Sequence, residues 1–457
     1  MNGIGMKSGS LEHISRALRE APLPALRQML PDKDILGACT QAGYAFRRRL
    51  YGPIVTVFHF LLQALQREES FAGTWEELWS SVIATMGMDK CKFNSSALSQ
   101  ARSRFPKAAL KVLVRKACKI SEKRFSLWRG FRLLALDSTT VSMPAEKELF
   151  EYFGRHHARG VAVRYPLGTL CSLLAVGNSL IVGHRFGPYD RGELKTATPL
   201  LDNLEQGDLL LADRLFAGSP ALARTLAKGA DFLMRKNAKL IPQRLPVIQK
   251  FGDEDFLTDI PMSKPARKLD PSLPERVRVR LFNAKWTSPA GEKLQGWFVT
   301  SLRDSKRFRP RTLANLYHRR WRAETSYLEF KVFFHADVLR SKTTDNVEKE
   351  FAAHVLAYQL LRRLVVEAAG KHHKKPTEIS VLHAARWVTS FCSRMSVAPA
   401  WKLPLLYQRL LDAIASTEID VRPGRLEPRA LTREWKHYPH LRQSRAEWRK
   451  QRLAETG

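Results

Sequence analysis

Three kinds of sequence feature are scarce or missing, and each absence narrows what the protein can be. The five cysteines are scattered and form no CxxC pair, which excludes a disulfide framework and argues against a zinc knuckle. The apolar run Ile54–Leu65 is too short to span a bilayer and contains His59. Residues 1–24 contain no apolar signal core. We therefore expect an intracellular protein that makes no use of a membrane.

Acidic residues are also scarce relative to basic ones. The 457 residues contain 76 Lys and Arg against 44 Asp and Glu, a net charge of +32 with an isoelectric point near 10.3. An excess of this size indicates a polyanionic partner, because each Lys or Arg docked on a phosphate releases condensed counterions. An apolar fraction of 44% supplies material for packed cores. We expect a folded protein that binds nucleic acid.

Residue patterns divide the chain into five segments of different character. The segments are a helical region at 1–125, an α/β region at 126–236, a proline-rich β insertion at 237–300, long helices at 301–370, and a helical basic region at 371–457. The tail Arg422–Gly457 carries ten Lys and Arg against four Glu. Strands followed by helices in the second segment predict an α/β fold.

Short apolar runs in the second segment read as strands. Leu170–Val176 and Leu180–Phe186 flank Gly177-Asn178, a turn signal that predicts a hairpin. Asp208–Ala212 is a further buried-strand candidate, and Ser219–Lys228 reads as a helix that Gly229 ends.

Two aspartates follow apolar strands in nearly the same context, LLAL before Asp137 and LLLA before Asp213. The carboxyl ends of strands are where open α/β sheets place ligands. A single aspartate in such a place is more often a turn or helix cap. A pair on adjacent strands is different, because two carboxylates at close range repel each other and normally require a cation.

The third acidic candidate, Glu324, lies in a helix predicted over Arg311–Phe334, a stretch without Gly or Pro. At ~100° per residue, four positions fall within about 60° of one another on the helix. These positions are Tyr317, Arg320, Glu324 and Lys331. Trp321 and Leu328 lie beside this face, which predicts partial burial and partners for its charges. Arg319, Arg322 and Glu329 point the other way and fit a solvated charge stripe.

The same four positions match, without a gap, the Tyr-x2-Arg-x3-Glu-x6-Lys signature of the insertion-sequence-4 family of DDE transposases, which the chain therefore resembles. Asp137-Ser-Thr-Thr and Asp213-Arg-Leu-Phe resemble the first and second Asp motifs of that family. The resemblance covers most of the chain and is strongest from Leu133 to Lys331.

The resemblance implies an α/β fold in which an RNase H-like catalytic core carries a β-rich insertion and follows an α-helical N-terminal DNA-binding domain. It implies that Asp137, Asp213 and Glu324 are catalytic and hold two Mg²⁺ or Mn²⁺ ions. Oxygen ligands without His or Cys suit these ions rather than zinc. It also implies that the remaining signature residues, Tyr317, Arg320 and Lys331, bind the DNA end.

The implied function is metal-dependent cleavage of phosphodiester bonds and strand transfer at the ends of an insertion sequence. The implied partners are double-stranded DNA, as terminal inverted repeats and target, and a second copy of the chain in the DNA complex. The implied location is the bacterial cytoplasm, on the nucleoid. Two alternatives remain open: a nuclease without strand transfer, and a domesticated DNA-binding protein without catalysis.

A tryptophan in the β insertion captures a flipped base in the hairpin-forming members of the family. Trp297 is the corresponding candidate, but it is one residue out of register. That offset turns its side chain to the other face of the strand. We therefore expect Trp297 to pack in the core.

Overall fold

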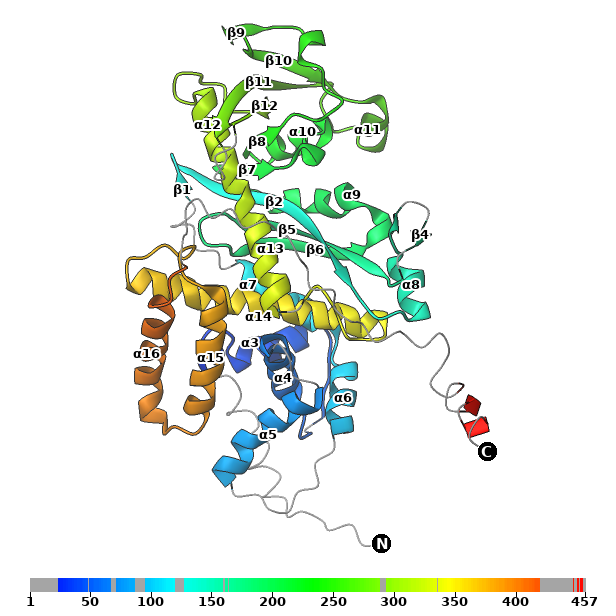
Figure 1. The fold of residues 1–457 in the computed structure, drawn as a ribbon, viewed down its shortest axis with the longest axis vertical. Helices are drawn as coiled ribbons and strands as arrows, with labels where there is room; N and C mark the ends of the chain where they lie inside the picture. Colours follow the sequence, from blue (N-terminus) through cyan, green and yellow to red (C-terminus); the bar gives the residue numbers. More distant parts are fainter. Residues whose placement is uncertain are drawn as a thin grey trace.

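The computed structural model describes residues 24–47, 49–66, 71–86, 95–119, 127–158, 161–162, 164–287, 293–334 and 336–419, with five positions between 447 and 454. Within these ranges the fold is mixed α/β, built on one large sheet (Figure 1). None of the helices described there is both long and apolar enough to cross a membrane. Cys91 and nearly all of the predicted basic tail Arg422–Gly457 lie outside the described residues.

The main sheet has ten strands in the order β6-β5-β2-β7-β8-β12-β11-β10-β9, with β1 paired to β2. Its strands are β1 (Leu127–Trp128), β2 (Phe131–Ser142), β5 (Leu167–Ala175), β6 (Ile181–Pro188), β7 (Asp208–Ala212), β8 (Asp231–Arg235), β9 (Gln249–Gly252), β10 (Asp255–Pro261), β11 (Arg276–Thr287) and β12 (Lys293–Thr300). The β2–β7 and β7–β8 pairs are parallel, and the other pairs are antiparallel. Strands β3 (His157–Ala158) and β4 (Val161–Ala162) form a separate pair.

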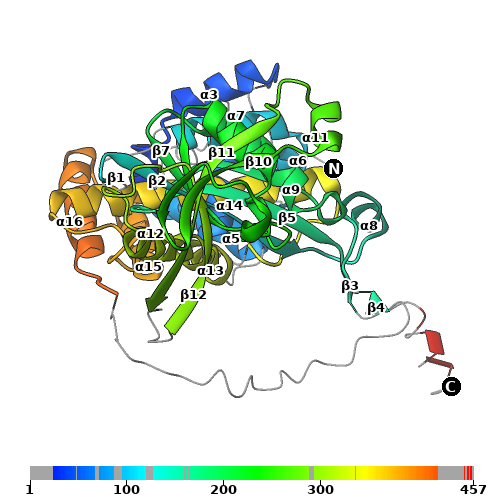
Figure 2. The same cartoon turned by 90° about the horizontal axis from the view of Figure 1, so that it is seen from above.

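The described part of the chain also contains fifteen α-helices of four or more residues. They are α2 (Pro24–Arg27), α3 (Asp32–Gln41), α4 (Pro53–Leu65), α5 (Phe71–Met86), α6 (Ser95–Arg104), α7 (Lys107–Lys119), α8 (Lys147–Phe153), α9 (Glu193–Ala197), α10 (Ser219–Ala227), α11 (Lys264–Leu269), α12 (Pro310–Tyr317), α13 (Trp321–Phe334), α14 (Thr344–Lys371), α15 (Val381–Ser396) and α16 (Leu403–Ala415). Figure 2 shows α15 and α16 on one side of the molecule and α8 on the opposite side.

Alternation along the central strands builds a core on each face of the sheet. On β2, Leu133 and Ala135 belong to one buried cluster, whereas Leu134 and Leu136 belong to the other. The first cluster includes apolar residues of α12, α13 and α14, and the second includes residues of α9 and α10. Helix α13 crosses the first face (Figure 1). Odd-numbered residues of β2 therefore face α13.

Three local predictions are confirmed. The hairpin joins β5 to β6, although the left-handed residue is Ser179, with φ 58°, rather than either residue of Gly177-Asn178. Strand β7 has the predicted bounds. Helix α10 ends at Ala227, and Gly229 follows with φ 70°, a conformation that glycine adopts without a steric penalty.

The predicted β-rich insertion continues the main sheet. Its last strand, β12, pairs with β8 in the register Phe298↔Arg235. Trp297 is partly buried against the second cluster and lies edge-on to Phe256 at a centroid distance of 6.1 Å. Its neighbour Phe298 lies in the first cluster. The register therefore turns Trp297 away from the face that α13 crosses, in agreement with the core packing expected for it.

The helices before residue 120 share their apolar core with the rest of the chain. Helices α4 and α7 pack against α14, and their buried residues belong to the first cluster together with those of α14. Lys349 of α14, only 2% exposed, donates to the carbonyl oxygen of Ser103 at 2.7 Å. This carbonyl lies in the last turn of α6, where a helix dipole favours a cation.

Candidate active site

Asp137 lies within β2 rather than at its end, which corrects the predicted strand boundary. The strand continues to Ser142 because residues 138–142 pair with β5, and Thr and Val favour a pleated, half-buried surface. As an odd-numbered residue of β2, Asp137 lies on the face that α13 crosses. Its Oδ1 accepts a hydrogen bond from the amide of Ser138 at 2.9 Å.

Asp213 directly follows β7 and caps the short 3-10 helix Arg214–Phe216, accepting from the Arg214 amide at 2.6 Å. Asp213 therefore also has a structural role as the cap of this short helix. The parallel register pairs Leu136 with Ala212, so the next residues along the two strands are the two aspartates. Leu209 and Leu211 belong to the same cluster as Leu133, and alternation places Asp213 toward that face as well.

Glu324 lies in the first turn of α13, and Arg320 connects it to Asp137. One terminal nitrogen of Arg320 is 3.2 Å from Asp137 Oδ2, and the other is 2.8 Å from Glu324 Oε1. Arg320 is only 8% exposed. The geometry therefore joins the strand and the helix through one guanidinium.

The pKa of Asp137 responds to the charges of the other two acidic groups. Burial raises the pKa of Asp137, and the charges of Glu324 and Asp213 raise it further. The Arg320 guanidinium and the Ser138 amide oppose this increase. Like charges near a half-buried carboxyl disfavour its ionised form, so this group of carboxylates favours binding of a cation.

The donor set fits a hard divalent ion, but the acidic groups are not arranged as a ready ligand cluster. No group of three or more His, Cys, Asp or Glu side chains within the described ranges has the arrangement of a metal site. Arg320 contacts two of the three carboxylates in the position of a counter-cation. All three acids supply oxygen atoms, the ligands that Mg²⁺ and Mn²⁺ prefer.

Tyr317 is buried and supports Arg320. Its ring lies edge-on to Phe298 at 5.3 Å, and the Arg320 guanidinium carbon is 5.8 Å from the ring centroid. Burial raises the pKa of Tyr317 to about 12, against the effect of Arg320, while the charge of Asp213 adds to the increase. The phenol is therefore protonated at neutral pH and is a poor nucleophile.

Lys331 lies two helical turns beyond Glu324, on a partly buried part of α13. Burial lowers the pKa of Lys331, and the charge of Asp337 opposes that decrease. Asp337 lies next to the far end of β2, where its carbonyl oxygen accepts from the Ser142 amide at 2.7 Å. Lys331 therefore lies well beyond the Arg320 contact, which precedes the start of α13.

The predicted continuous helix is wrong, and the predicted solvated face is confirmed for Arg319, which is exposed, but not for Arg322 and Glu329. The turn His318–Arg320 is a 3-10 helix between α12 and α13, which changes the angular spacing of the side chains. Glu329 is 6% exposed and pairs with Arg322 at 3.1 Å, whereas Trp321 and Leu328 are 55% and 60% exposed. The charged side chains are buried because partners on other elements satisfy them.

Sequence reasoning missed Tyr327, which is 7% exposed. Its hydroxyl donates to the main-chain oxygen of Asp137 at 2.6 Å. The available signal was its spacing, three residues after Glu324, which places the two side chains on neighbouring positions of one helix.

Comparisons with known proteins identify similar sequences over most of the chain. The profile of the family described as Transposase DDE domain matches residues 128–360. Transposase InsG for insertion sequence element IS4, from Escherichia coli (strain K12), is 25% identical over 443 residues, which cover 94% of this chain and 96% of InsG. The cryo-EM structure of the piggyBac transposase synaptic complex with hairpin DNA superposes with a TM-score of 0.43 at 11% identity, covering 86% of this chain and 85% of that chain.

Proposed function

The chain belongs to the DDE transposase family, and from this premise we propose that Asp137, Asp213 and Glu324 form its metal-binding catalytic triad. The protein is a transposase, an enzyme that cleaves and rejoins DNA during transposition of an insertion sequence. The relevant observation is the register of β2 and β7, together with the Arg320 contacts to Asp137 and Glu324. These contacts bring Asp137 close to Glu324, which lies far from it in the sequence.

We assign β6, β5, β2, β7 and β8 to an RNase H-like core, with β9–β12 as its insertion. The assignment is supported by the order of these five strands and by the α13 crossing over the face that carries Asp137. The core also includes α12, α13 and part of α14.

The three carboxylates would hold two Mg²⁺ or Mn²⁺ ions. When bound, such ions activate the attacking oxygen and stabilise the leaving oxygen at phosphorus. Asp137 contributes from β2 and Asp213 from the end of β7, two positions fixed by main-chain pairing. Glu324 contributes from a helix and depends on how that helix is positioned. Arg320 offsets the charge of two acids before the ions are present.

DNA contact is assigned to the remaining signature residues. Arg320 carries a planar guanidinium that can bind a phosphate with two donors, whereas Lys331 acts as a point charge. Tyr317 acts through Arg320, because its ring is buried beside the guanidinium. We assign recognition of the element ends to the helices before residue 120 and to the basic tail, and we propose a dimer in the DNA complex.

The test of this function uses the full chain and duplexes that end in the terminal inverted repeat flanking its reading frame. We expect cleavage at the repeat and joining to a target duplex, both dependent on Mg²⁺ or Mn²⁺. Cleavage without joining would identify a nuclease. Binding without cleavage in either metal would identify a DNA-binding protein that has lost catalysis.

A further inference from the structure

Glu324 is the one acid of the proposed triad that main-chain pairing does not position. Asp137 and Asp213 lie on or directly after strands that pair in a parallel register. Glu324 instead depends on the rotation and height of α13 above the sheet. A helix resting on apolar contacts alone can adjust by small shifts, whereas hydrogen bonds constrain direction and distance.

The side of α13 that faces the sheet forms a hydrogen bond to β2, the strand that contains Asp137. The Tyr327 hydroxyl donates to the main-chain oxygen of Asp137 at 2.6 Å, across 190 residues of sequence. Tyr327 is one turn beyond Glu324, so the contact fixes the helix close to the acid that it presents. The bond ends on the main chain of Asp137 and does not involve its carboxylate.

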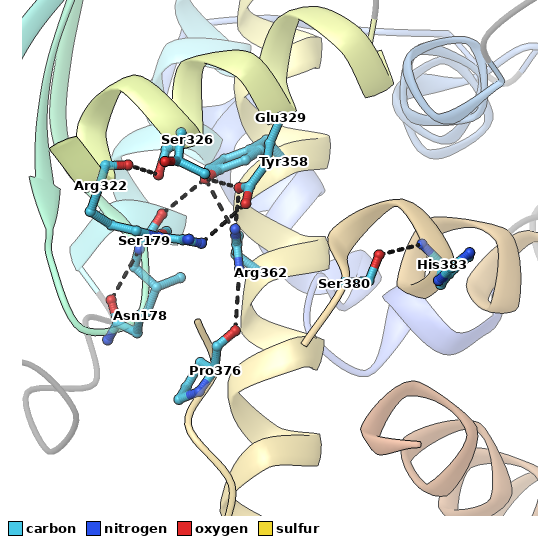
Figure 3. A network of polar contacts seen from close by, with 12 residues as sticks. Asn178, Ser179, Arg322, Ser326, Glu329, Tyr358, Arg362, Pro376, Ser380 and His383 are labelled. Carbon is cyan, nitrogen blue, oxygen red and sulfur yellow. Dashed lines mark hydrogen bonds and ion pairs between the residues drawn. The ribbon is translucent and has the colours of Figure 1, made fainter. Parts of the chain in front are cut away.

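A second anchor of the same helix is the network of polar contacts around Glu329 (Figure 3). Glu329 accepts from Arg322 of α13 and from Arg362 of α14, a fully buried arginine. Arg322 also donates to the Ser179 hydroxyl at 2.5 Å, in the turn between β5 and β6. Tyr358 donates to the Ser179 carbonyl oxygen at 3.2 Å. The network links α13 to α14 and to the hairpin.

We propose that Tyr327 is a positioning residue that sets Glu324 against Asp137, with the Arg322–Glu329–Arg362 network as a second anchor of the same helix. The inference rests on the proposed function, because it assumes that the two acids share metal ligation. Tyr327 takes no part in chemistry itself: its hydroxyl is buried and bonded to a carbonyl. It acts by fixing the distance between helix and strand.

The test compares Tyr327→Phe, which removes one hydroxyl and keeps the ring, with Tyr407→Phe. Tyr407 lies on α16, is 5% exposed, and donates to Glu367 at 2.7 Å. Both variants lose a hydrogen bond of a buried tyrosine, so both should lose some thermal stability. Tyr327→Phe alone should weaken Mn²⁺ binding, measured by titration calorimetry with an element-end duplex present. We expect a weakening of about tenfold or more, typical when support of a metal ligand is lost.

Turnover adds a second readout. In Tyr327→Phe, kcat should fall while KM for the DNA end stays unchanged, because the DNA contacts are intact. Ser179→Gly loosens the other anchor without backbone strain, because Ser179 already has a positive φ. It should shift Mn²⁺ affinity in the same direction by a smaller factor.

Two results separate failure of the inference from failure of the proposed function. If Tyr327→Phe binds Mn²⁺ and turns over like Tyr407→Phe, the tyrosine is only structural and the inference is overturned. If Asp137→Asn and Glu324→Gln also leave Mn²⁺ affinity unchanged, the triad assignment itself is wrong.

Discussion

Arg320 lies 3.2 Å from Asp137 Oδ2, although 183 residues separate the two in the chain. The same guanidinium reaches Glu324, so one arginine bridges the acids proposed to hold metal ions. Metal ions would compete with Arg320 for the two carboxylates, and a DNA phosphate would compete with the carboxylates for Arg320. We propose that Arg320 exchanges its carboxylate contacts for a DNA phosphate when the ions bind.

Arg320→Lys tests this exchange at constant net charge. A lysine cannot present two planar donors, so one charged contact is lost. We expect kcat for cleavage of an element end to fall by about 10- to 100-fold, equivalent to about 1.5–3 kcal/mol for one charged hydrogen bond. Arg319→Lys, at an exposed neighbouring position, is the matched control. Equal losses in the two variants would mean that the bridge has no catalytic consequence.

Lys331→Ala should weaken binding of element ends and reduce the salt dependence of affinity by about one unit of slope, because one phosphate contact is removed. Arg319→Ala should change the slope less. Fluorescence anisotropy across a salt series measures both. A Lys331→Ala slope equal to that of the wild type would remove Lys331 from the DNA interface.

Asp137 should make stability depend on pH in the metal-free protein. Its folded-state pKa is raised above the ordinary 3.8, so the unfolded chain releases this proton at lower pH than the folded chain does. Its contribution to stability should decline as pH rises from about 3.8 through the raised folded-state pKa, and then stay constant. In thermal unfolding with chelator, Asp137→Asn should lack this component. Identical pH profiles for the two proteins would contradict the raised pKa.

Removal of the N-terminal helices should unfold the protein rather than leave a working core. Helices α4 and α7 cover apolar residues of α14, and a chain that begins at Lys123 would expose them to water. We expect circular dichroism of this truncation to show no cooperative unfolding transition. A folded truncation that still selects the terminal repeat would also contradict the assignment of end recognition to this region.

Local sequence patterns were sufficient where the cause of structure is local. The apolar run of β7 and the helix that ends before Gly229 are specified by neighbouring residues. The end of β2 was not predicted, because its extension through Ser142 depends on pairing with β5, which follows 25 residues later. The positions of Asp137 and Asp213 as neighbours could be predicted, because each follows an apolar strand run and the carboxyl ends of adjacent parallel strands lie at the same edge of a sheet.

The faces of α13 could not be predicted from helical spacing alone. Helical-wheel arithmetic gives only the angular position of each residue, whereas Glu329 is buried because its partner Arg362 lies on another helix. Exposure of Trp321 likewise reflects the absence of a covering element among the described residues rather than any property of tryptophan. Contacts with other elements therefore reversed the predicted division of α13 into a buried and a solvated face. They did not change the position predicted for Glu324.

The central claim is that Asp137, Asp213 and Glu324 hold the metal ions that cleave DNA. Its most direct test is single-turnover cleavage of an element-end duplex by Asp137→Asn, Asp213→Asn and Glu324→Gln. Asp259→Asn, in the insertion, is the control. We predict losses of about 10³-fold or more in the three variants, with DNA affinity within a few-fold of the wild type and normal cleavage by the control. Cleavage by Glu324→Gln at the wild-type rate would contradict the account.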